Sequence, residues 1–264
     1  MKGRRLGQHF LNDPAVLGRI VDAAGLTDSD TVVEIGPGPG GLTRLLAGKV
    51  RHVIAIELDE ALFRRLRSKL GEERNIDLIQ GDALKFPFGT LGRFKVVSNI
   101  PYYVTTPIIF ALLDARENLE TMTLTIQKEV AERIVAPPGG KDYGVLSIMV
   151  QYRADPELKF VIPKEAFIPP PRVDSAVVHI RMREKPRVLV KDEAVFFRVV
   201  KTAFSQRRKT LANSLKSLGE DIRGILTRSG IDPKRRPETL SLPEFAGLAD
   251  LLFEESGPAP DGRK

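Results

Sequence analysis

The chain has 264 residues, 42% of them hydrophobic, which is enough to bury a core without disulfides and excludes a disordered tail protein. The absence of cysteine excludes thiol catalysis and cysteine zinc sites, and three histidines are too few for a histidine metal cluster, so we expect no metal. The net charge of +7 favours a polyanionic partner. No stretch approaches the roughly 18 apolar residues that span a bilayer, and nothing after Met1 resembles a signal peptide, so we expect a soluble cytoplasmic protein with no membrane partner.

The first predicted helix follows Asp13-Pro14, a capping residue and a proline at the first helical position. From Thr31 onward, short apolar runs alternate with longer helical patterns, which is typical of a mostly parallel sheet covered on both faces by helices. The predicted strands are Thr31–Ile35, His52–Glu57, Ile76–Ile79, Lys95–Asn99 and Met122–Gln127, with helices at Gly41–Gly48 and Asp59–Leu70. Two later strands, Glu157–Ile162 and Ala176–Met182, form the predicted antiparallel end of this α/β sheet.

After Pro186 the strand pattern stops, and helix-length segments indicate a small all-α domain. These segments are Glu193–Phe204, Lys209–Leu218, Asp221–Ser229 and Pro243–Phe253. From residue 191 to 236 there are 12 basic and 5 acidic residues, and the basic ones are densest at Arg207–Lys209 and Lys234–Arg236. These runs could meet phosphates at helix ends, or they could form an ordinary solvated face. The predicted domains are 1–185, a basic helical domain at 186–255, and a disordered tail at 256–264.

The first predicted strand ends in a glycine-rich turn that opens a helix. The spacing of Gly36, Gly38 and Gly41 satisfies the dinucleotide-binding fingerprint, so an NAD enzyme has to be considered. Pyrophosphate binding needs backbone N–H donors at this turn, and Pro37 and Pro39 have none. The turn therefore favours a ligand that has a cationic end and no phosphate.

S-adenosylmethionine is such a ligand, because it carries a sulfonium, an ammonium and a ribose. Gly36 and Gly38 would let the backbone approach it closely. Glu57 ends the next strand and could accept hydrogen bonds from both ribose hydroxyls, or it could be an exposed strand-end acid. Asp82 follows the third strand and could accept a hydrogen bond from the adenine amino group, or it could simply cap a turn. Glu34 could serve only to organise the loop.

Asn99 lies at the carboxyl end of a predicted buried strand, where open α/β sheets present ligands. Asn99, Ile100, Pro101 and Tyr102 could form an ordinary turn, but they also suit methyl transfer to an exocyclic adenine amine. This amine is a poor nucleophile because its lone pair is delocalised into the ring. If Asn99 Oδ1 and the Ile100 carbonyl each accept one N6 hydrogen, the lone pair turns toward the sulfonium methyl without a strong base. Pro101 would stiffen the turn, and Tyr102 would stack on the base.

Phe167 could supply a second aromatic face for the same base. It is followed by Ile168 and three successive prolines, a stiff segment that leads into the last predicted strand. The residues alone leave open whether Phe167 contacts a base or is a packed loop residue.

Eight motifs in this order resemble those of the ribosomal RNA adenine N6-dimethyltransferases, from about Arg4 to Leu252. The motifs are Gln8–Asp13, Glu34–Gly38, Ile56–Asp59, Gly81–Ala83, Asn99–Tyr103, Gln127–Val130, Tyr143–Ser147 and Phe167–Ser175. Ser205–Leu211 and Gly230–Pro233 are similar to the small-subunit, KsgA-type branch rather than to the large-subunit branch that confers macrolide resistance. One such motif would be weak, whereas eight in register are highly specific.

The resemblance implies a Rossmann-like S-adenosylmethionine-dependent methyltransferase domain. Its implied reaction is dimethylation of N6 in two adjacent adenosines of a hairpin near the 3′ end of 16S rRNA, within a small ribosomal subunit precursor. The residues implied around the methyl donor are His9, Leu11, Gly36, Glu57, Asp82 and Asn99, and Phe167 is implied to stack opposite Tyr102. We expect a monomer. A large-subunit rRNA adenine methyltransferase and a non-catalytic ribosome assembly factor stay open as alternatives.

Overall fold

The computed structural model describes residues 9–206 and 208–256. These residues form two compact units. The sheet unit comprises residues 9–131 and 155–182, and the helical unit comprises residues 132–154, 183–206 and 208–256. Arg207 and all of the predicted disordered tail except Ser256 lie outside the described residues.

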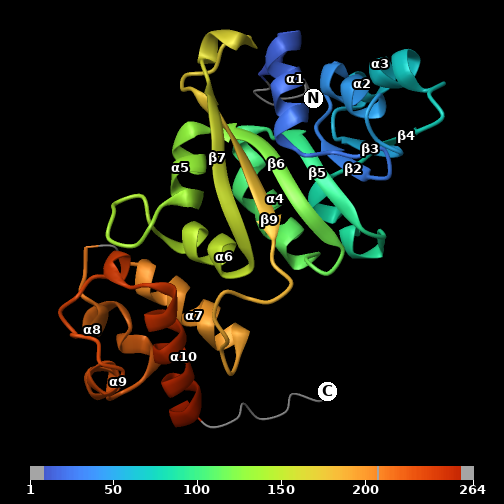
Figure 1. Cartoon of the computed structure of the whole chain (residues 1–264). Helices are drawn as coiled ribbons and strands as arrows, with labels where there is room; N and C mark the ends of the chain where they lie inside the picture. The colour runs from blue at the N-terminus through green and yellow to red at the C-terminus, as the bar shows by residue number, and fades with distance from the viewer. Residues whose placement is uncertain (1–8, 207, 257–264) are drawn as a thin grey trace. The chain divides into compact units, whose positions relative to one another are not determined.

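The sheet unit is built on a seven-stranded sheet with the order β4-β3-β2-β5-β6-β9-β7 (Figure 1). The strands are β2 (Thr31–Ile35), β3 (His52–Glu57), β4 (Ile76–Gln80), β5 (Phe94–Asn99), β6 (Leu119–Gln127), β7 (Ala154–Ile162) and β9 (Ser175–Met182). Neighbours from β4 to β6 pair in parallel, and β9 pairs antiparallel with β6. The predicted parallel sheet with an antiparallel end is confirmed, and its parallel strands all end at one edge.

Helices α1 (Pro14–Ala23), α2 (Gly41–Ala47), α3 (Glu60–Leu70) and α4 (Thr105–Asp114) pack on this sheet (Figure 1). The predicted cap at Asp13 is present, with its Oδ1 accepting a hydrogen bond from the amide of Ala15 at 2.9 Å. Asp59, predicted as the first residue of a helix, caps α3. Successive strand residues point to opposite faces, and Val32 and Val33 of β2 are both 0% exposed. Both faces of the sheet are therefore covered, as the predicted α/β fold requires.

A second, two-stranded sheet joins segments that are far apart in the sequence, β1 (Phe10–Leu11) and β8 (Phe167–Ile168). In this antiparallel pair Phe10 faces Ile168, and Leu11 faces Phe167. Leu11 and Phe167 are buried in a hydrophobic cluster that they share with residues of α1, α2 and α3. The pairing therefore fixes the segment before α1 against the segment that precedes β9.

The helical unit consists mainly of helices around one hydrophobic cluster. Its helices are α6 (Val145–Arg153), α7 (Glu193–Phe204), α8 (Leu211–Ser214), α9 (Ile222–Arg228) and α10 (Leu242–Ser256), and α5 (Lys128–Val135) links it to β6. Whereas the sequence predicts one boundary after residue 185, residues 132–154 belong to this unit. The physical reason is that Tyr143, Ile148 and Tyr152 are buried in its core, where the Tyr152 ring stacks on Phe196 with centroids 4.8 Å apart.

One predicted helix of this unit, Lys209–Leu218, is shorter in the structure. Helix α8 spans only Leu211–Ser214, and a 3-10 turn follows at Lys216–Leu218. The first amides of α8 bond to a neighbouring loop: the Leu211 amide donates to the Arg235 carbonyl at 2.8 Å, and the Ala212 amide donates to the Pro233 carbonyl at 3.1 Å. These bonds hold the start of α8 against the loop that carries the second predicted basic run, Lys234–Arg236.

No helix within residues 9–206 and 208–256 is both long and apolar enough to cross a membrane. The same residues contain no group of three His, Asp or Glu side chains that could hold a metal ion.

Candidate functional site

The polar residues singled out in the sequence follow the carboxyl ends of four parallel strands. Gly36 follows β2, Glu57 ends β3, Asp82 follows β4 and Asn99 ends β5. Because parallel strands end at the same edge, the fold gathers these four residues at one edge of the sheet. Two adjoining pockets open there.

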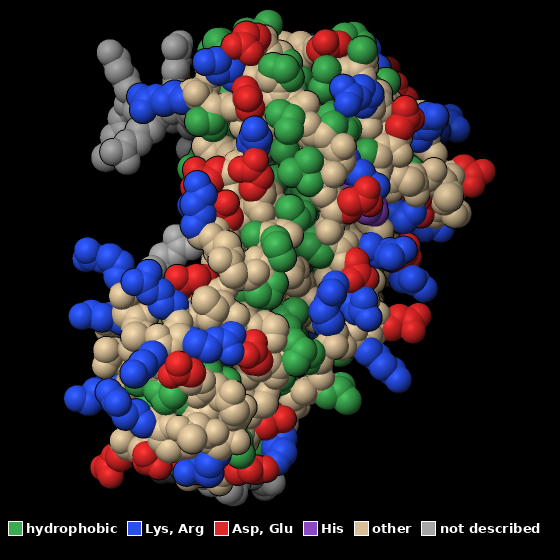
Figure 2. Space-filling view, turned by 60° about the vertical axis from the view of Figure 1, so that its left-hand side comes forward, with side chains coloured by type: hydrophobic (Ala, Val, Ile, Leu, Met, Phe, Trp, Pro, Cys, Tyr) green, Lys and Arg blue, Asp and Glu red, His purple; other side chains and the backbone are tan. Residues whose placement is uncertain are grey.

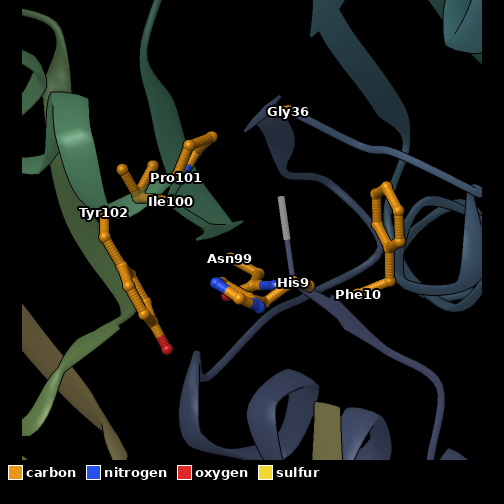
Figure 3. A pocket seen from close by; sticks show the side chains of 7 residues that line it. All are labelled: His9, Phe10, Gly36, Asn99, Ile100, Pro101 and Tyr102. Atoms are coloured by element: carbon orange, nitrogen blue, oxygen red, sulfur yellow. Dashed lines mark hydrogen bonds between the residues drawn. The ribbon is translucent and has the colours of Figure 1, made fainter. Parts of the chain in front are cut away.

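The first, the aromatic pocket, is lined by His9, Phe10, Gly36, Asn99, Ile100, Pro101 and Tyr102 (Figure 3). The ring of Tyr102 lies on one side and that of Phe10 on the other, with His9 and Asn99 between them. The His9 and Tyr102 ring centroids are 5.7 Å apart, with the planes tilted by 32°. No charged carboxylate or basic side chain other than the His9 imidazole lines this pocket, so it suits a flat, neutral group.

Asn99 and Ile100 present two carbonyl oxygens at this pocket. The side-chain amide of Asn99 donates to the backbone carbonyl of His9 at 3.2 Å, which fixes the amide group and leaves Oδ1 as its acceptor. The Ile100 amide donates to the Thr125 carbonyl at 3.0 Å, and among the described residues no donor reaches the Ile100 carbonyl oxygen. Both oxygens are therefore available to accept hydrogen bonds from a bound molecule.

Tyr102 is held by its hydroxyl group. The hydroxyl oxygen lies 2.6 Å from Ser175 Oγ at the start of β9, and burial raises the pKa of the Tyr102 phenol above its usual value. The side chain therefore stays neutral at physiological pH, with its ring against the pocket. Pro101 begins the 3-10 turn Tyr102–Val104, where it fixes the backbone that carries this ring.

The second pocket, the carboxylate cleft, has a cavity volume of about 150 Å³. Its lining includes Glu57 and Asp82, together with Tyr103. Gly36 and Pro101 line both pockets, so the carboxylate cleft and the aromatic pocket adjoin. The structure thus places the predicted residues in two adjoining pockets, one acidic and one neutral, which share Gly36 and Pro101.

Glu57 is 1% exposed, so the alternative of an exposed strand-end acid is wrong. Its two carboxylate oxygens accept hydrogen bonds from backbone amides, Oε2 from Gly38 at 3.1 Å and Oε1 from Asp59 at 2.9 Å. Burial raises the pKa of this carboxyl, while the two amides favour its ionised form. Glu57 therefore orders the glycine loop and faces the cleft at the same time.

Asp82 caps a turn, which is one of the two roles that the sequence left open. Its Oδ1 accepts a hydrogen bond from the Leu84 amide at 3.0 Å and caps a 3-10 turn, so it is a capping residue. It also lines the carboxylate cleft. Oδ2 makes no hydrogen bond within the described residues and can accept one from a ligand.

The glycine loop requires its glycines at two positions. Gly36 and Gly38 have positive φ values of +70° and +54°. A Cβ atom at Gly38 would lie 2.9 Å from the Phe10 ring, and one at Gly36 would lie 3.4 Å from Pro101 Cδ. A side chain at Gly36 would narrow the space that the two pockets share, whereas Gly38, predicted to approach the methyl donor, lines neither pocket and packs against the Phe10 ring.

Glu34, below this loop, is 2% exposed, and its Oε2 has no hydrogen-bond partner. Burial raises the pKa of the Glu34 carboxyl to about 8, and the negative charge of Glu57 adds to the effect. At neutral pH Glu34 is therefore mainly a neutral carboxylic acid. A cationic ligand group near the loop would favour its ionised form.

Phe167 and Leu11 are not brought into either pocket. Phe167 is 1% exposed and Leu11 is 7% exposed, and both pack in the hydrophobic cluster beneath β1 and β8. The ring that lies against Tyr102 is that of His9, so the structure contains no clamp between Phe167 and Tyr102. Phe167 is therefore a packed residue in this structure, which is the second of the two possibilities that the sequence left open.

The sequence analysis did not identify Phe10 and Tyr103 as site residues. Phe10 reaches the aromatic pocket through the two-residue strand β1, which is too short to leave a periodic pattern. Tyr103 directly follows Tyr102 but lines the carboxylate cleft, so consecutive residues of one turn face different pockets. The sequence signal that could have identified Tyr103 is the pair of tyrosines that directly follows Asn-Ile-Pro.

A family model described as "Ribosomal RNA adenine dimethylase" matches residues 2–253 of the chain. The Ribosomal RNA small subunit methyltransferase A of Clostridium acetobutylicum is 48% identical over 257 residues, which cover 95% of this chain and 93% of that protein. The protein of the same name from Moorella thermoacetica is 46% identical, over 93% of this chain and 91% of its own.

Two solved structures are similar over nearly the whole chain. A dimethyladenosine transferase from Plasmodium falciparum is 27% identical with a TM-score of 0.76, covering 91% of this chain and 96% of its own. The 23S rRNA methyltransferase ErmE is 28% identical with a TM-score of 0.71, covering 92% of this chain and 99% of its own. Both likenesses extend well beyond the sheet unit alone.

Proposed function

Because the chain belongs to the ribosomal RNA adenine dimethylase family and is an S-adenosylmethionine-dependent rRNA adenine methyltransferase, we propose that it acts on the small subunit. Its substrate is the N6 amine of two adjacent adenosines in a hairpin near the 3′ end of 16S rRNA. It acts as a monomer in the cytoplasm on a small-subunit precursor. The supporting observation is that relatives 45–48% identical are called small subunit methyltransferases.

The geometric observation that carries the reaction is the junction of the two pockets at Gly36 and Pro101. A methyl group can pass directly between a donor in the carboxylate cleft and a base in the aromatic pocket only if the two adjoin. The acidic pocket suits the cationic donor, and the neutral aromatic pocket suits the adenine ring.

The residues present fit S-adenosylmethionine. Gly36, which lines both pockets without a side chain, lets the backbone approach the donor closely, and Pro37 and Pro39 offer no amides to a phosphate. Glu57 and Asp82 would accept hydrogen bonds from the ribose and the adenine, and the unpartnered Glu34 Oε2 lies below the loop. When bound, S-adenosylmethionine supplies a methyl carbon that is made electrophilic by a positively charged sulfur.

Asn99 and Ile100 perform the central step on the acceptor base. Asn99 Oδ1 and the Ile100 carbonyl each accept one hydrogen of N6, which allows the nitrogen to become tetrahedral and exposes its lone pair. As N6 gains positive charge, the two fixed carbonyl dipoles stabilise that charge more than they stabilise the neutral amine. The bond from Asn99 Nδ2 to the His9 carbonyl holds the amide in this orientation before the base arrives.

Tyr102 orients the base, and the His9 ring lies next to the Tyr102 ring, between it and Phe10. Stacking on the Tyr102 ring holds the adenine plane while its N6 reaches Asn99. After the first transfer only one N6 hydrogen remains, so the second transfer requires the amine to rotate and the pocket to accommodate one methyl group.

The helical unit is proposed to contact rRNA. Figure 2 shows many Lys and Arg side chains on the molecular surface. Backbone bonds from the start of α8 to the Arg235 and Pro233 carbonyls hold α8 against the loop that carries the second basic run. Among the described residues, Lys209, Lys234 and Arg236 are not paired with a carboxylate. Arg235 instead pairs with Glu244 inside the unit. Uncompensated basic side chains on neighbouring loops are suited to RNA phosphates.

The two alternatives are less well supported. ErmE, named as a 23S rRNA methyltransferase, shares the fold but is only 28% identical, against 45–48% for the small-subunit relatives. A purely non-catalytic assembly factor would not need Asn99 held with its oxygen toward an aromatic pocket.

The experiment is methyl transfer from labelled S-adenosylmethionine to undermethylated small subunits, with large subunits as the control substrate. We expect two adjacent adenosines near the 3′ end of 16S rRNA to become dimethylated, and Asn99→Ala to abolish the transfer. Label on the large subunit instead would support the alternative substrate. Binding of small subunits without any transfer would support the assembly factor.

A further inference from the structure

The segment from Ile168, at the end of β8, to Asp174, before β9, carries two exposed apolar side chains and one exposed cation. Ile168 is 63% exposed and Val173 is 45% exposed. The Arg172 side chain is exposed and has no carboxylate partner among the described residues. Single exposed apolar residues are common, so exposure alone carries no meaning. This segment differs from such residues in two ways: it is anchored at both ends, and it lies beside the aromatic pocket.

The segment is anchored at both ends. At its start, Phe167 is buried beneath it, and the His9 ring donates from Nδ1 to the Pro169 carbonyl at 2.7 Å. At its end, Asp174 Oδ1 accepts a hydrogen bond from the Lys164 amide at 3.1 Å. Residues 169–171 are all proline, which restricts the backbone between the anchors. Ile168 is therefore presented on a rigid support and not on a loose loop.

The anchored segment runs beside the aromatic pocket. Ile168 faces Phe10 across the antiparallel β1–β8 pair, and facing residues of such a pair project on the same side. Phe10 lines the pocket. At the other end, Ser175 contacts the Tyr102 hydroxyl at 2.6 Å. Ile168 thus stands next to the pocket wall that lies opposite Tyr102 in Figure 3.

An adenosine that enters the aromatic pocket must leave the base stack of its RNA, and its neighbour then loses a stacking partner. Proteins that unstack bases commonly insert an apolar side chain at the opened step. We propose that Ile168 is a positioning residue that occupies this gap and stacks on the base next to the target adenosine, while Arg172 contacts the adjoining phosphate. This proposal rests on the proposed function.

The test measures methyl transfer to undermethylated small subunits by wild type, Ile168→Ala, Ile168→Leu and Ile168→Asp. We expect Ile168→Ala to lower kcat/KM about tenfold, because one stacking contact is lost. Ile168→Leu should stay within about twofold of wild type, since it restores an apolar surface, and Ile168→Asp should be the slowest. The dissociation constant for S-adenosylmethionine and the melting temperature should change little in all three.

Val161→Ala is the matched control, because Val161 is a 39% exposed apolar residue on β7 of the same unit. It should transfer methyl groups at the wild-type rate. Full activity of Ile168→Ala, or a loss that Ile168→Leu does not restore, would overturn the proposed role of Ile168 while leaving the proposed function intact. A wild-type protein that transfers nothing to small subunits would overturn both.

Discussion

The aromatic pocket and the carboxylate cleft lie at the same sheet edge and share Gly36 and Pro101, yet they differ in chemistry. The aromatic pocket offers rings and carbonyl oxygens, whereas the cleft offers the carboxylates of Glu57 and Asp82. This difference matches the two partners of a methyl transfer, of which one is a flat neutral base and the other is a cation. If the proposed function holds, charge as well as shape distinguishes the pocket of the base from that of the methyl donor.

The two pockets also differ in how they are held. The aromatic pocket depends on contacts between distant segments, such as the hydrogen bond from Asn99 to the His9 carbonyl. The cleft depends on backbone amides that donate to a buried carboxylate, such as those of Gly38 and Asp59 to Glu57. Substitutions in one pocket should therefore affect one substrate far more than the other.

The largest effect is expected for Asn99→Ala. Removing one preorganised dipole from the developing charge on N6 should cost about 3 kcal/mol or more, which lowers kcat at least 100-fold. RNA binding should change much less, because stacking on Tyr102 remains. Single-turnover transfer and filter binding measure the two quantities. Asn213→Ala, an exposed asparagine of α8, is the control and should keep the wild-type rate.

Glu57→Gln should weaken donor binding and leave RNA binding unchanged. With Gln at this position, the hydrogen bonds to the donor no longer involve a charged group, which should cost about 1.5–3 kcal/mol of binding free energy. The dissociation constant for the donor should therefore rise roughly 10- to 100-fold. Calorimetric titration with S-adenosylmethionine measures it. Glu60→Gln, at an exposed i, i+4 pair on α3, is the control. Equal losses of donor and RNA affinity would contradict the division between the pockets.

Tyr102→Ala should lower kcat/KM for RNA by a factor that corresponds to about 1–3 kcal/mol of stacking. Tyr102→Phe keeps the ring and loses only the contact with Ser175, so it should retain most of the activity. Tyr103→Ala, one residue away in the cleft, should instead raise the KM for the donor. If the Tyr102 and Tyr103 variants affected the same substrate, the two tyrosines would not serve separate pockets.

Glu34 is expected to affect stability and not catalysis. Since the folded protein holds a proton on Glu34 up to about pH 8 and the unfolded chain releases it above about pH 4.5, stability falls as the pH rises through this window. The contribution is at most about 1.4 kcal/mol per pH unit. Thermal unfolding at pH 5.5 and 7.5 should show a smaller decrease for Glu34→Gln than for wild type. Identical decreases would mean that Glu34 is ionised in the folded protein.

The sequence predicted the strands β2 to β6 closely, because each is a short stretch with apolar residues between caps and turns, and all but β4 are largely buried. It did not predict α4 (Thr105–Asp114), whose Ile108, Ile109, Leu112 and Leu113 are all buried and leave little amphipathic period to recognise. It also placed residues 132–154 with the sheet, since nothing local shows that Tyr143 and Tyr152 pack among distant helices.

The same limit applies to the site. Residues at the ends of parallel strands, such as Glu57 and Asn99, could be predicted because topology brings strand ends together. The position of Phe167 could not be predicted. It depends on the pairing of β1 with β8, two strands of two residues each that lie far apart in the sequence. Whether Phe167 faces a base or the core is decided by that pairing and by the cluster beneath it.

The most direct measurement is a crystal structure with S-adenosylhomocysteine in the cleft and an RNA carrying the target adenosine. The account predicts that N6 lies about 3 Å from both Asn99 Oδ1 and the Ile100 carbonyl oxygen, with the sulfur on the side of Gly36. An adenine whose N6 points away from Asn99, or a donor bound outside the carboxylate cleft, would contradict it.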